Sequence, residues 1–127
     1  MFDVNKAILV GRLGANPVVR PTKSGMSRAT FPLATSRYIK SEGTDGESEG
    51  REETQWHQVV AWGKQAERCA KYLSKGQPVF VEGTIRSRKY EKEGENRYFF
   101  EIHAERFSFF GKAQTAEPVT EEAASLT

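Results

Sequence analysis

The two tryptophans of the chain lie six residues apart, in the segment QWHQVVAW at residues 55–62. Side chains of a β-strand alternate between its faces, so Trp56 and Trp62 share one face. The opposite face carries side chains small and apolar enough to face a core: His57, Val59 and Ala61. The indoles therefore either belong to a second buried layer or form an exposed platform on which flat groups stack. Because the core face is already occupied, we favour the platform.

A second strand-like segment carries alternating cations. Along the strand predicted over residues 78–90, Arg86, Arg88 and Tyr90 share the outer face, and Lys89 lies beside them. Cations follow a phosphate backbone and aromatic rings accept bases by stacking, so this combination is typical of proteins that bind single-stranded nucleic acids. The alternative is a solvated strand edge, which charged side chains protect against aggregation.

The residues that could support catalysis do not form a recognisable pattern. The chain has two histidines, His57 and His103, and neither has metal-ligand spacing to Cys69 or to a pair of carboxylates. There is no glycine-rich phosphate loop, and no serine or cysteine has a base at a familiar spacing. We therefore expect a protein that is not an enzyme and that holds no metal or cofactor. A single cysteine excludes an internal disulfide and fits a reducing cytoplasm.

The charge of the chain is unevenly distributed. The formal net charge is +2, but residues 40–53 carry −4 and residues 113–127 carry −3. Subtracting both segments leaves +9 on the remaining body, which fits either a polyanionic partner or solubilising lysines. At 127 residues the chain is long enough for one core and too short for two ordinary domains. We find no signal peptide and no membrane span, so we expect a cytoplasmic protein without membrane contact.

The hydrophobic pattern predicts an all-β protein with one short helix. Strands are expected near residues 4–10, 28–35, 55–62, 78–90 and 97–110, with Pro32 at an edge-like or bulged site. Between the third and fourth strands, a helix over 65–74 presents an apolar stripe and stops at Gly76: Ala66, Cys69, Ala70 and Leu73. This order is that of the OB-fold, a five-stranded Greek-key barrel.

Three further segments complete the organisation. Residues 41–53 are rich in glycine, serine and glutamate and are interpreted as a mobile loop inside the domain. The charged stretch 91–96 is interpreted as a hairpin tip. The domain is expected to span residues 1–111, followed by a short disordered tail over 112–127. Most of the late phenylalanines are interpreted as core or subunit contacts: Phe99, Phe100, Phe107, Phe109 and Phe110.

Four segments resemble the bacterial single-stranded DNA-binding protein family: NKAILVGRLGANPVVR, FPLATS, TQWHQVVAWGKQAERCAKYLSKG and VFVEGTIRSRKYEKEGENRYFFEI. The resemblance covers about residues 4–111 in the same order and spacing. It implies an OB-fold that binds single-stranded DNA without catalysis or metal, in DNA replication, recombination and repair. It also implies a homo-oligomer, usually a tetramer, located in the cytoplasm with the nucleoid.

The resemblance assigns roles residue by residue. The aromatic positions implied for base stacking are Trp56, Trp62 and Tyr90. The cations implied for contacts with the DNA backbone are Arg86, Arg88, Lys89, Lys64, Lys75, Arg97, Arg20 and Lys6. The residues implied at a subunit interface are His57 and the first strand segment with Val4, Asn5, Ile8 and Val10.

The sequence departs from the family at two places. Ile39 stands where relatives have a stacking aromatic, and Tyr38, with Arg37 beside it, is the candidate replacement. The tail lacks the acidic tip ending in Ile-Pro-Phe that recruits replication and repair proteins in the family, so that partner prediction stays open. The rival hypotheses are a replication-accessory OB protein that binds mainly other proteins, and an enzyme with a convergent acid, base or metal site.

Overall fold

The computed structural model describes residues 2–42 and 48–110 of the chain. Its elements follow the chain in the order β1 (Ala7–Leu13), β2 (Val18–Pro21), β3 (Ser27–Glu42), β4 (Ser48–Trp62), α1 (Lys64–Tyr72), β5 (Pro78–Lys92) and β6 (Glu95–Phe109). The predicted all-β character with one helix is therefore confirmed. The predicted domain boundary at 111 and the predicted tail over 112–127 lie outside the described residues.

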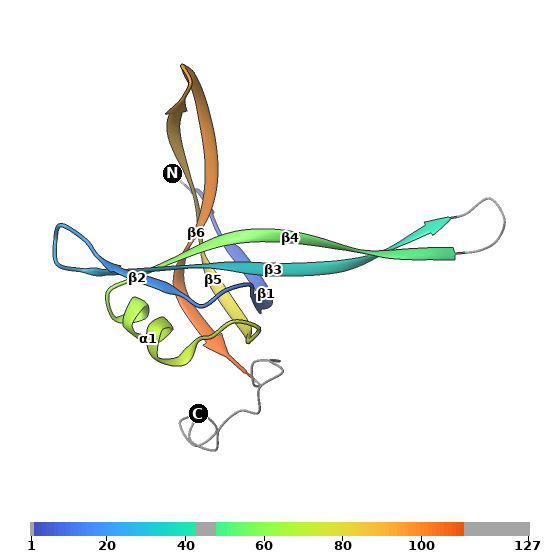
Figure 1. Cartoon of the computed structure of the whole chain (residues 1–127), viewed down its shortest axis with the longest axis horizontal. Coiled ribbons are helices and arrows are strands. Elements are labelled where there is room, and N and C mark those ends of the chain that lie inside the picture. The colour runs from blue at the N-terminus through green and yellow to red at the C-terminus, as the bar shows by residue number, and fades with distance from the viewer. Residues whose placement is uncertain (1, 43–47, 111–127) are drawn as a thin grey trace.

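Five of the strands close into a barrel (Figure 1). The strand order is β1-β5-β6-β4-β3-β2, and β1 also pairs with β3, at Arg12–Ala34 and Leu13–Leu33. This second pairing joins the two sides of the sheet and leaves the short β2 outside, paired with β3 at Val18–Thr30 through Pro21–Ser27. The β4–β6 pair is parallel and the other pairs are antiparallel.

The interior of the barrel is filled by the inward residues of all five strands. Phe31, Leu33, Val59, Val79 and Val81 are almost completely buried there. The helix α1 adds Ala66 and Cys69 to this core, and Leu73 follows directly after the helix. Burial of such apolar side chains is the main stabilising contribution in a barrel of this size.

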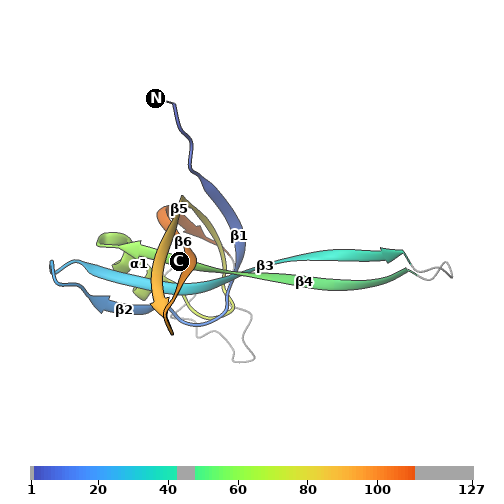
Figure 2. The ribbon, with the colours of Figure 1, turned by 90° about the horizontal axis from the view of Figure 1, so that it is seen from above.

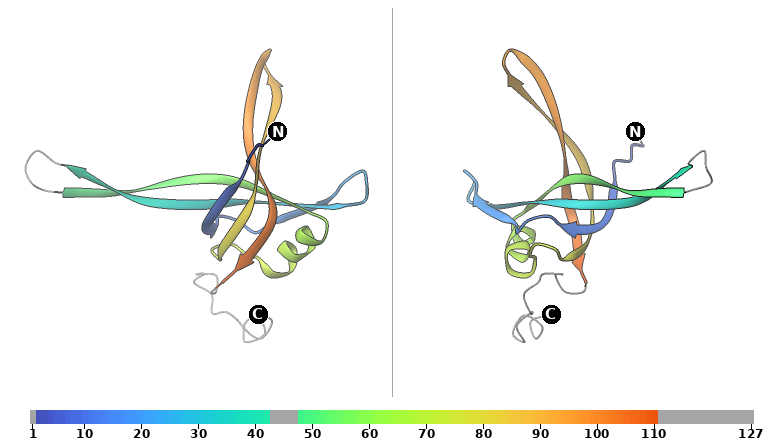
Figure 3. Two further views of the ribbon diagram at one scale, coloured as in Figure 1. Left: turned by 180° about the vertical axis from the view of Figure 1, so that it is seen from behind. Right: turned by 45° about the vertical axis from the view of Figure 1, so that its right-hand side comes forward.

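Two long hairpins leave the barrel in different directions. The β3–β4 arm (residues 35–42 and 48–57) begins where β4 loses its pairing with β6, and the β5–β6 arm (residues 86–100) begins beyond Ile85–Ile102. Figure 1 shows the first arm pointing to the right and the second pointing upward. Figures 2 and 3 show the β3–β4 arm extending well beyond the barrel from other directions.

Several sequence predictions need correction. The stretch 41–53 is not a loop, because residues 48–53 belong to β4 and pair with β3 through Arg37–Glu53 and Ile39–Arg51. Backbone pairing does not require apolar side chains, so the polar composition of this stretch gave no sign of a strand. Residues 43–47 lie outside the described part of the chain. The helix ends at Tyr72 instead of Ser74. Ala70 was predicted to belong to the buried stripe but is exposed, because the side of the helix that is buried is the one with Ala66 and Cys69. The strand β2 was not predicted.

Two other local predictions are confirmed. Pro32 lies between the stretches of β3 that pair with β2 and with β1, and its carbonyl accepts the Gly14 amide at 2.9 Å. Its missing N–H thus falls at an edge-like site without a ladder partner. The charged tip is a two-residue turn of Glu93 and Gly94, both with positive φ, between the paired Lys92 and Glu95.

A close backbone approach at Gly11 allows the barrel to close. A Cβ at this position would overlap the carbonyl oxygen of Ala34 on β3, next to the β1–β3 pairing. The sequence predicted that the first strand ends at residue 10. In the structure the strand continues through Gly11, which lies inside β1. Only a residue without a side chain fits where two backbones approach this closely.

In the described residues, no helix is both long enough and apolar enough to cross a membrane.

Replacing Gly11 with alanine should destabilise the barrel, because the added methyl group must displace the backbone of β3. We expect a loss of about 1–3 kcal/mol in the free energy of unfolding, measured by urea denaturation. The control is Gly25→Asn, since Gly25 faces open space and asparagine tolerates its positive φ. A Gly11→Ala protein as stable as the Gly25→Asn protein would contradict this account of closure.

Candidate nucleic-acid interface

A cleft of about 500 Å³ opens where the two arms diverge. Residues from four strands line it: Arg28, Thr30, Pro32, Trp56, His57, Gln58, Arg88, Phe99, Phe100 and Glu101. The cleft therefore brings together the predicted residues Trp56, His57 and Arg88 with several residues that the sequence analysis did not select. Its lining combines aromatic rings with guanidinium groups, the two side-chain types that take up bases and phosphates.

Trp56 is an exposed platform at this cleft, as the alternation in its strand predicted. Its side chain is 62% exposed. The indole lies across Gly14, where a Cβ would overlap the ring, with Pro32 also close to that position. A glycine beneath the ring lets the indole lie against the backbone while its other face stays open to solvent.

Trp62 is only half-buried and is not an open platform, which corrects the prediction of an exposed ring. Its indole Nε1 donates a hydrogen bond to His103 Nδ1 at 3.2 Å, and the guanidinium carbon of Arg28 lies 5.5 Å from the ring centre. Val60, on the same outer face, is completely buried. Here β4 has strand partners on both sides, at Thr30 and His103, and their side chains shelter this stretch of the face.

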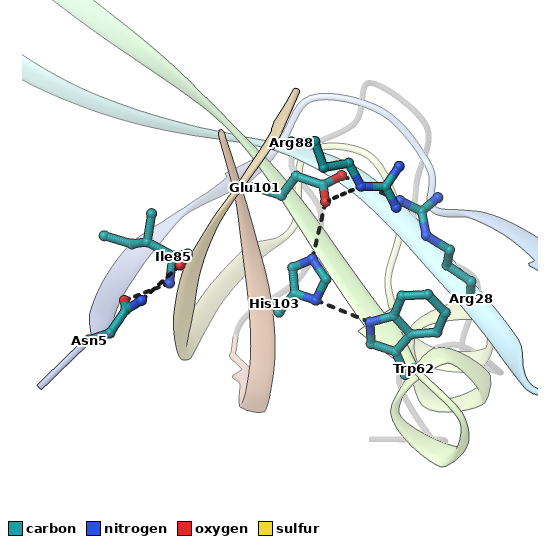
Figure 4. A network of polar contacts seen from close by, with 7 residues as sticks. All are labelled: Asn5, Arg28, Trp62, Ile85, Arg88, Glu101 and His103. Carbon is teal, nitrogen blue, oxygen red and sulfur yellow. Dashed lines mark hydrogen bonds and ion pairs between the residues drawn. The ribbon is translucent and has the colours of Figure 1, made fainter. Parts of the chain in front are cut away.

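Glu101 forms a polar centre in the wall of the cleft, although its side chain is almost completely buried. One carboxylate oxygen lies 3.3 Å from Arg28 Nη2, and the other lies 3.2 Å from Arg88 Nε and 3.1 Å from His103 Nε2. Figure 4 shows this chain of contacts running from Arg88 through Glu101 and His103 to Trp62. Sequence reasoning missed Arg28, Glu101 and His103 because it had no information on which residues face one another across strands.

The β5–β6 arm contributes an aromatic and cationic group on the same side as Glu101. Phe99 pairs with Arg88 across the arm, and the ring centre of Tyr90 lies 5.6 Å from that of Phe99. Phe99 and Phe100 are 37% and 66% exposed, and both line the cleft. Phe99 and Phe100 therefore do not lie in the barrel core, whereas Phe107 does. A subunit contact at Phe99 and Phe100 stays a prediction.

The β3–β4 arm carries Tyr38 on the face that also carries Trp56. Residue pairing places both on the outer side of the ladder, and Tyr38 is 70% exposed. The tyrosine ring lies over Gly50, where a Cβ would overlap it. Arg37 lies on the other face and pairs with Glu53 at 3.5 Å. Tyr38 therefore has the exposure and the orientation expected of a stacking residue, while Ile39 faces the other way.

The remaining predicted cations are exposed but do not line the cleft: Arg20, Lys64, Lys75, Arg86, Lys89 and Arg97. Lys6 also lies elsewhere, where its ammonium group contacts the Glu82 carboxylate at 2.7 Å. This hydrogen bond and the carboxylate charge raise the pKa of Lys6, and the same contact lowers the pKa of Glu82. Whether these seven cations contact DNA stays a prediction.

The residues predicted at a subunit interface lie on β1, on the segment before it and on β4. Val4, Ile8 and Val10 have exposed side chains. Asn5 makes two hydrogen bonds of 2.9 Å to the backbone of Ile85, so its side chain extends the pairing of β1 with β5 (Figure 4). His57 lies on the inward side of β4, as predicted, and its Nε2 is 2.8 Å from Thr35 Oγ1.

Burial raises the pKa of the Cys69 thiol to about 12, so the group stays protonated in the core. Within residues 2–42 and 48–110, no group of three or more His, Cys, Asp or Glu side chains is placed to hold a metal ion.

The closed barrel, the helix before β5 and the cleft between two arms define an OB-fold protein with a surface suited to a strand-like ligand. Residues 4–110 match the Single-strand binding protein family, and the chain belongs to that family. It is 43% identical over 101 residues to Single-stranded DNA-binding protein 1 of Chlorobaculum tepidum. The match covers 78% of this chain and 60% of that relative, so the chain spans less than two thirds of the relative's length.

A solved structure confirms the fold. The chain is similar to the protein in a structure described as Plasmodium falciparum SSB complex with ssDNA, with a TM-score of 0.76 and 28% sequence identity. The similarity covers 87% of this chain and 98% of that one. The OB-fold predicted from the order of strands and helix, and the family predicted from the four segments, are therefore both confirmed.

Proposed function

We propose that the protein binds single-stranded DNA with little sequence preference and coats it during replication, recombination and repair. The observation that carries this proposal is the exposed indole of Trp56 at a cleft that also contains Arg28 and Arg88. Stacking accepts any base, and cations contact phosphates irrespective of sequence. Family membership and the DNA complex of the Plasmodium falciparum relative support the same function.

The strand would follow the outer face from one arm to the other. On this path the bases would stack on Trp56, Tyr38 and the Tyr90–Phe99 group, while the arginines of the cleft hold the phosphates. The exposed cations outside the cleft would extend the contact along the backbone. No step of this function needs catalysis or a cofactor, and the protein would act in the cytoplasm, at the nucleoid, where single-stranded DNA arises.

Replacing Trp56 with alanine should weaken binding to poly-dT, because a stacking surface is lost. We expect a loss of about 1–3 kcal/mol in binding free energy, with little change in thermal stability since the ring is mostly exposed. Because the variants lack the Trp56 indole, their binding is measured by fluorescence anisotropy of a labelled oligo-dT at low and high salt; tryptophan quenching is used for the unmodified protein. Trp56→Phe is the matched control and should lose less, because it keeps a ring.

Duplex DNA serves as the second control in this titration. Strong quenching by poly-dT with little effect of duplex would support the proposal. Absence of binding by the unmodified protein would remove it and would favour the alternative, an OB protein that contacts other proteins.

We further propose that the chain assembles as a homo-oligomer, with four copies as the expected number, through β1. Ile8 and Val10 expose apolar side chains on this strand, and Val4 does so on the segment before it. In the described part of the chain, β1 pairs with β3 at Arg12 and Leu13, so residues 7–11 present an edge without a partner strand there. An apolar surface beside an open strand edge favours pairing with a second copy.

Replacing Ile8 with aspartate should break this assembly, because a charge would be buried between subunits. In light scattering, the unmodified protein should have a molar mass that is a multiple of 14.3 kDa, and we expect four chains. The Ile8→Asp protein should have a smaller molar mass. Met26→Asp is the control, since Met26 is an exposed apolar residue away from β1. A monomeric unmodified protein, or an Ile8→Asp protein of unchanged mass, would contradict the proposal.

A further inference from the structure

A buried carboxylate at the centre of a surface proposed to bind a polyanion is unexpected. The side chain of Glu101 is 3% exposed and lies in the wall of the cleft between the two arms. Its charge repels phosphates, and its removal from water is unfavourable unless partners compensate. A contribution of Glu101 to binding must therefore come from what the carboxylate holds in place.

Glu101 holds two guanidinium groups that come from different strands. Arg28 extends from β3 and Arg88 from β5, and each contacts a different oxygen of the carboxylate on β6. The arginine side chains remain 25% and 50% exposed, so both groups keep a surface for a ligand. An arginine already fixed in one geometry loses less conformational freedom when a phosphate binds than an unrestrained arginine loses.

His103 connects the same carboxylate to Trp62. An indole N–H can only donate, so His103 Nδ1 must accept the bond from Trp62 Nε1. The proton of the neutral imidazole then lies on Nε2 and is donated to Glu101 Oε1 at 3.1 Å. The carboxylate thus orients the imidazole, and the imidazole orients the indole, whose ring lies under Arg28.

We propose that Glu101 is a positioning residue of the DNA interface, acting through Arg28, Arg88 and His103 without touching DNA. The inference rests on the proposed function. It makes Trp62, which is hydrogen-bonded to His103 and half-buried, a held ring beside Arg28, in contrast to the exposed indole of Trp56. One acidic side chain then sets the geometry of two cations and one aromatic ring.

Replacing Glu101 with glutamine separates this role from a simple charge effect. Removal of a negative charge from a polyanion site should tighten binding if only net charge matters. If Glu101 positions its partners, Glu101→Gln should instead weaken binding to oligo-dT by about tenfold, since hydrogen bonds to charged groups are lost. The matched control is Glu91→Gln on the β5–β6 arm, an exposed side chain with the same change in charge, and this variant should bind equally well or slightly tighter. Unchanged or tighter binding by a folded Glu101→Gln protein would overturn the proposal.

Variants of His103 test the connection to Trp62 even if Glu101→Gln fails to fold. In a Trp56→Phe background Trp62 is the only tryptophan, so its emission reports its environment. His103→Leu cannot bridge and should shift this emission and weaken binding. His103→Gln offers an oxygen to the indole and an N–H to Glu101, and should restore both properties toward those of the parent.

Equal emission and equal affinity of the His103→Leu and His103→Gln variants would overturn the proposal that His103 connects Glu101 to Trp62. The emission comparison is made without DNA. It therefore still tests the positioning of Trp62 if the unmodified protein does not bind single strands, a result that would remove the proposed function alone.

Discussion

A short parallel contact between β4 and β6, three residue pairs long, closes the barrel and determines where the two hairpins separate. Gln58–Glu101, Val59–Ile102 and Val60–His103 join the two halves of the barrel. On the inner side this contact places Val59 and Ile102 in the core. On the outer side it brings the β4 face that carries Trp62 beside His103 and Glu101. Because the contact is short, both hairpins separate beyond it, and their separation opens the cleft.

The interface that results combines rigid and open parts. Arg28 and Arg88 contact Glu101 in the lining of the cleft, and Trp62 is hydrogen-bonded to His103 beside it. Trp56 and Tyr38 lie further along the β3–β4 arm with most of their surface exposed, each resting on a glycine. A flexible polymer of variable sequence requires this kind of surface, in which fixed cations define the path and flat rings accept any base.

The sequence predicted those features that depend on one strand at a time. The alternation in residues 55–62 correctly placed Val59 and Ala61 in the core and Trp56 outside. The features that depend on pairing between strands were missed. Glu101, His103 and Arg28 acquire their roles only through the β4–β6 contact and the β3–β4 register, which no single segment encodes. The paired strands within 41–53 were missed because their stability comes from backbone pairing, and their polar side chains suggested a loop.

We have proposed that single-stranded DNA lies across the cleft between the two arms. Photocrosslinking with an oligo-dT that carries iododeoxyuridine, followed by mass-spectrometric mapping of the modified residues, tests it most directly. We expect adducts on aromatic residues of this face, with Trp56 and Phe99 foremost. Adducts confined to β1 or α1, with none on the cleft residues, would contradict it.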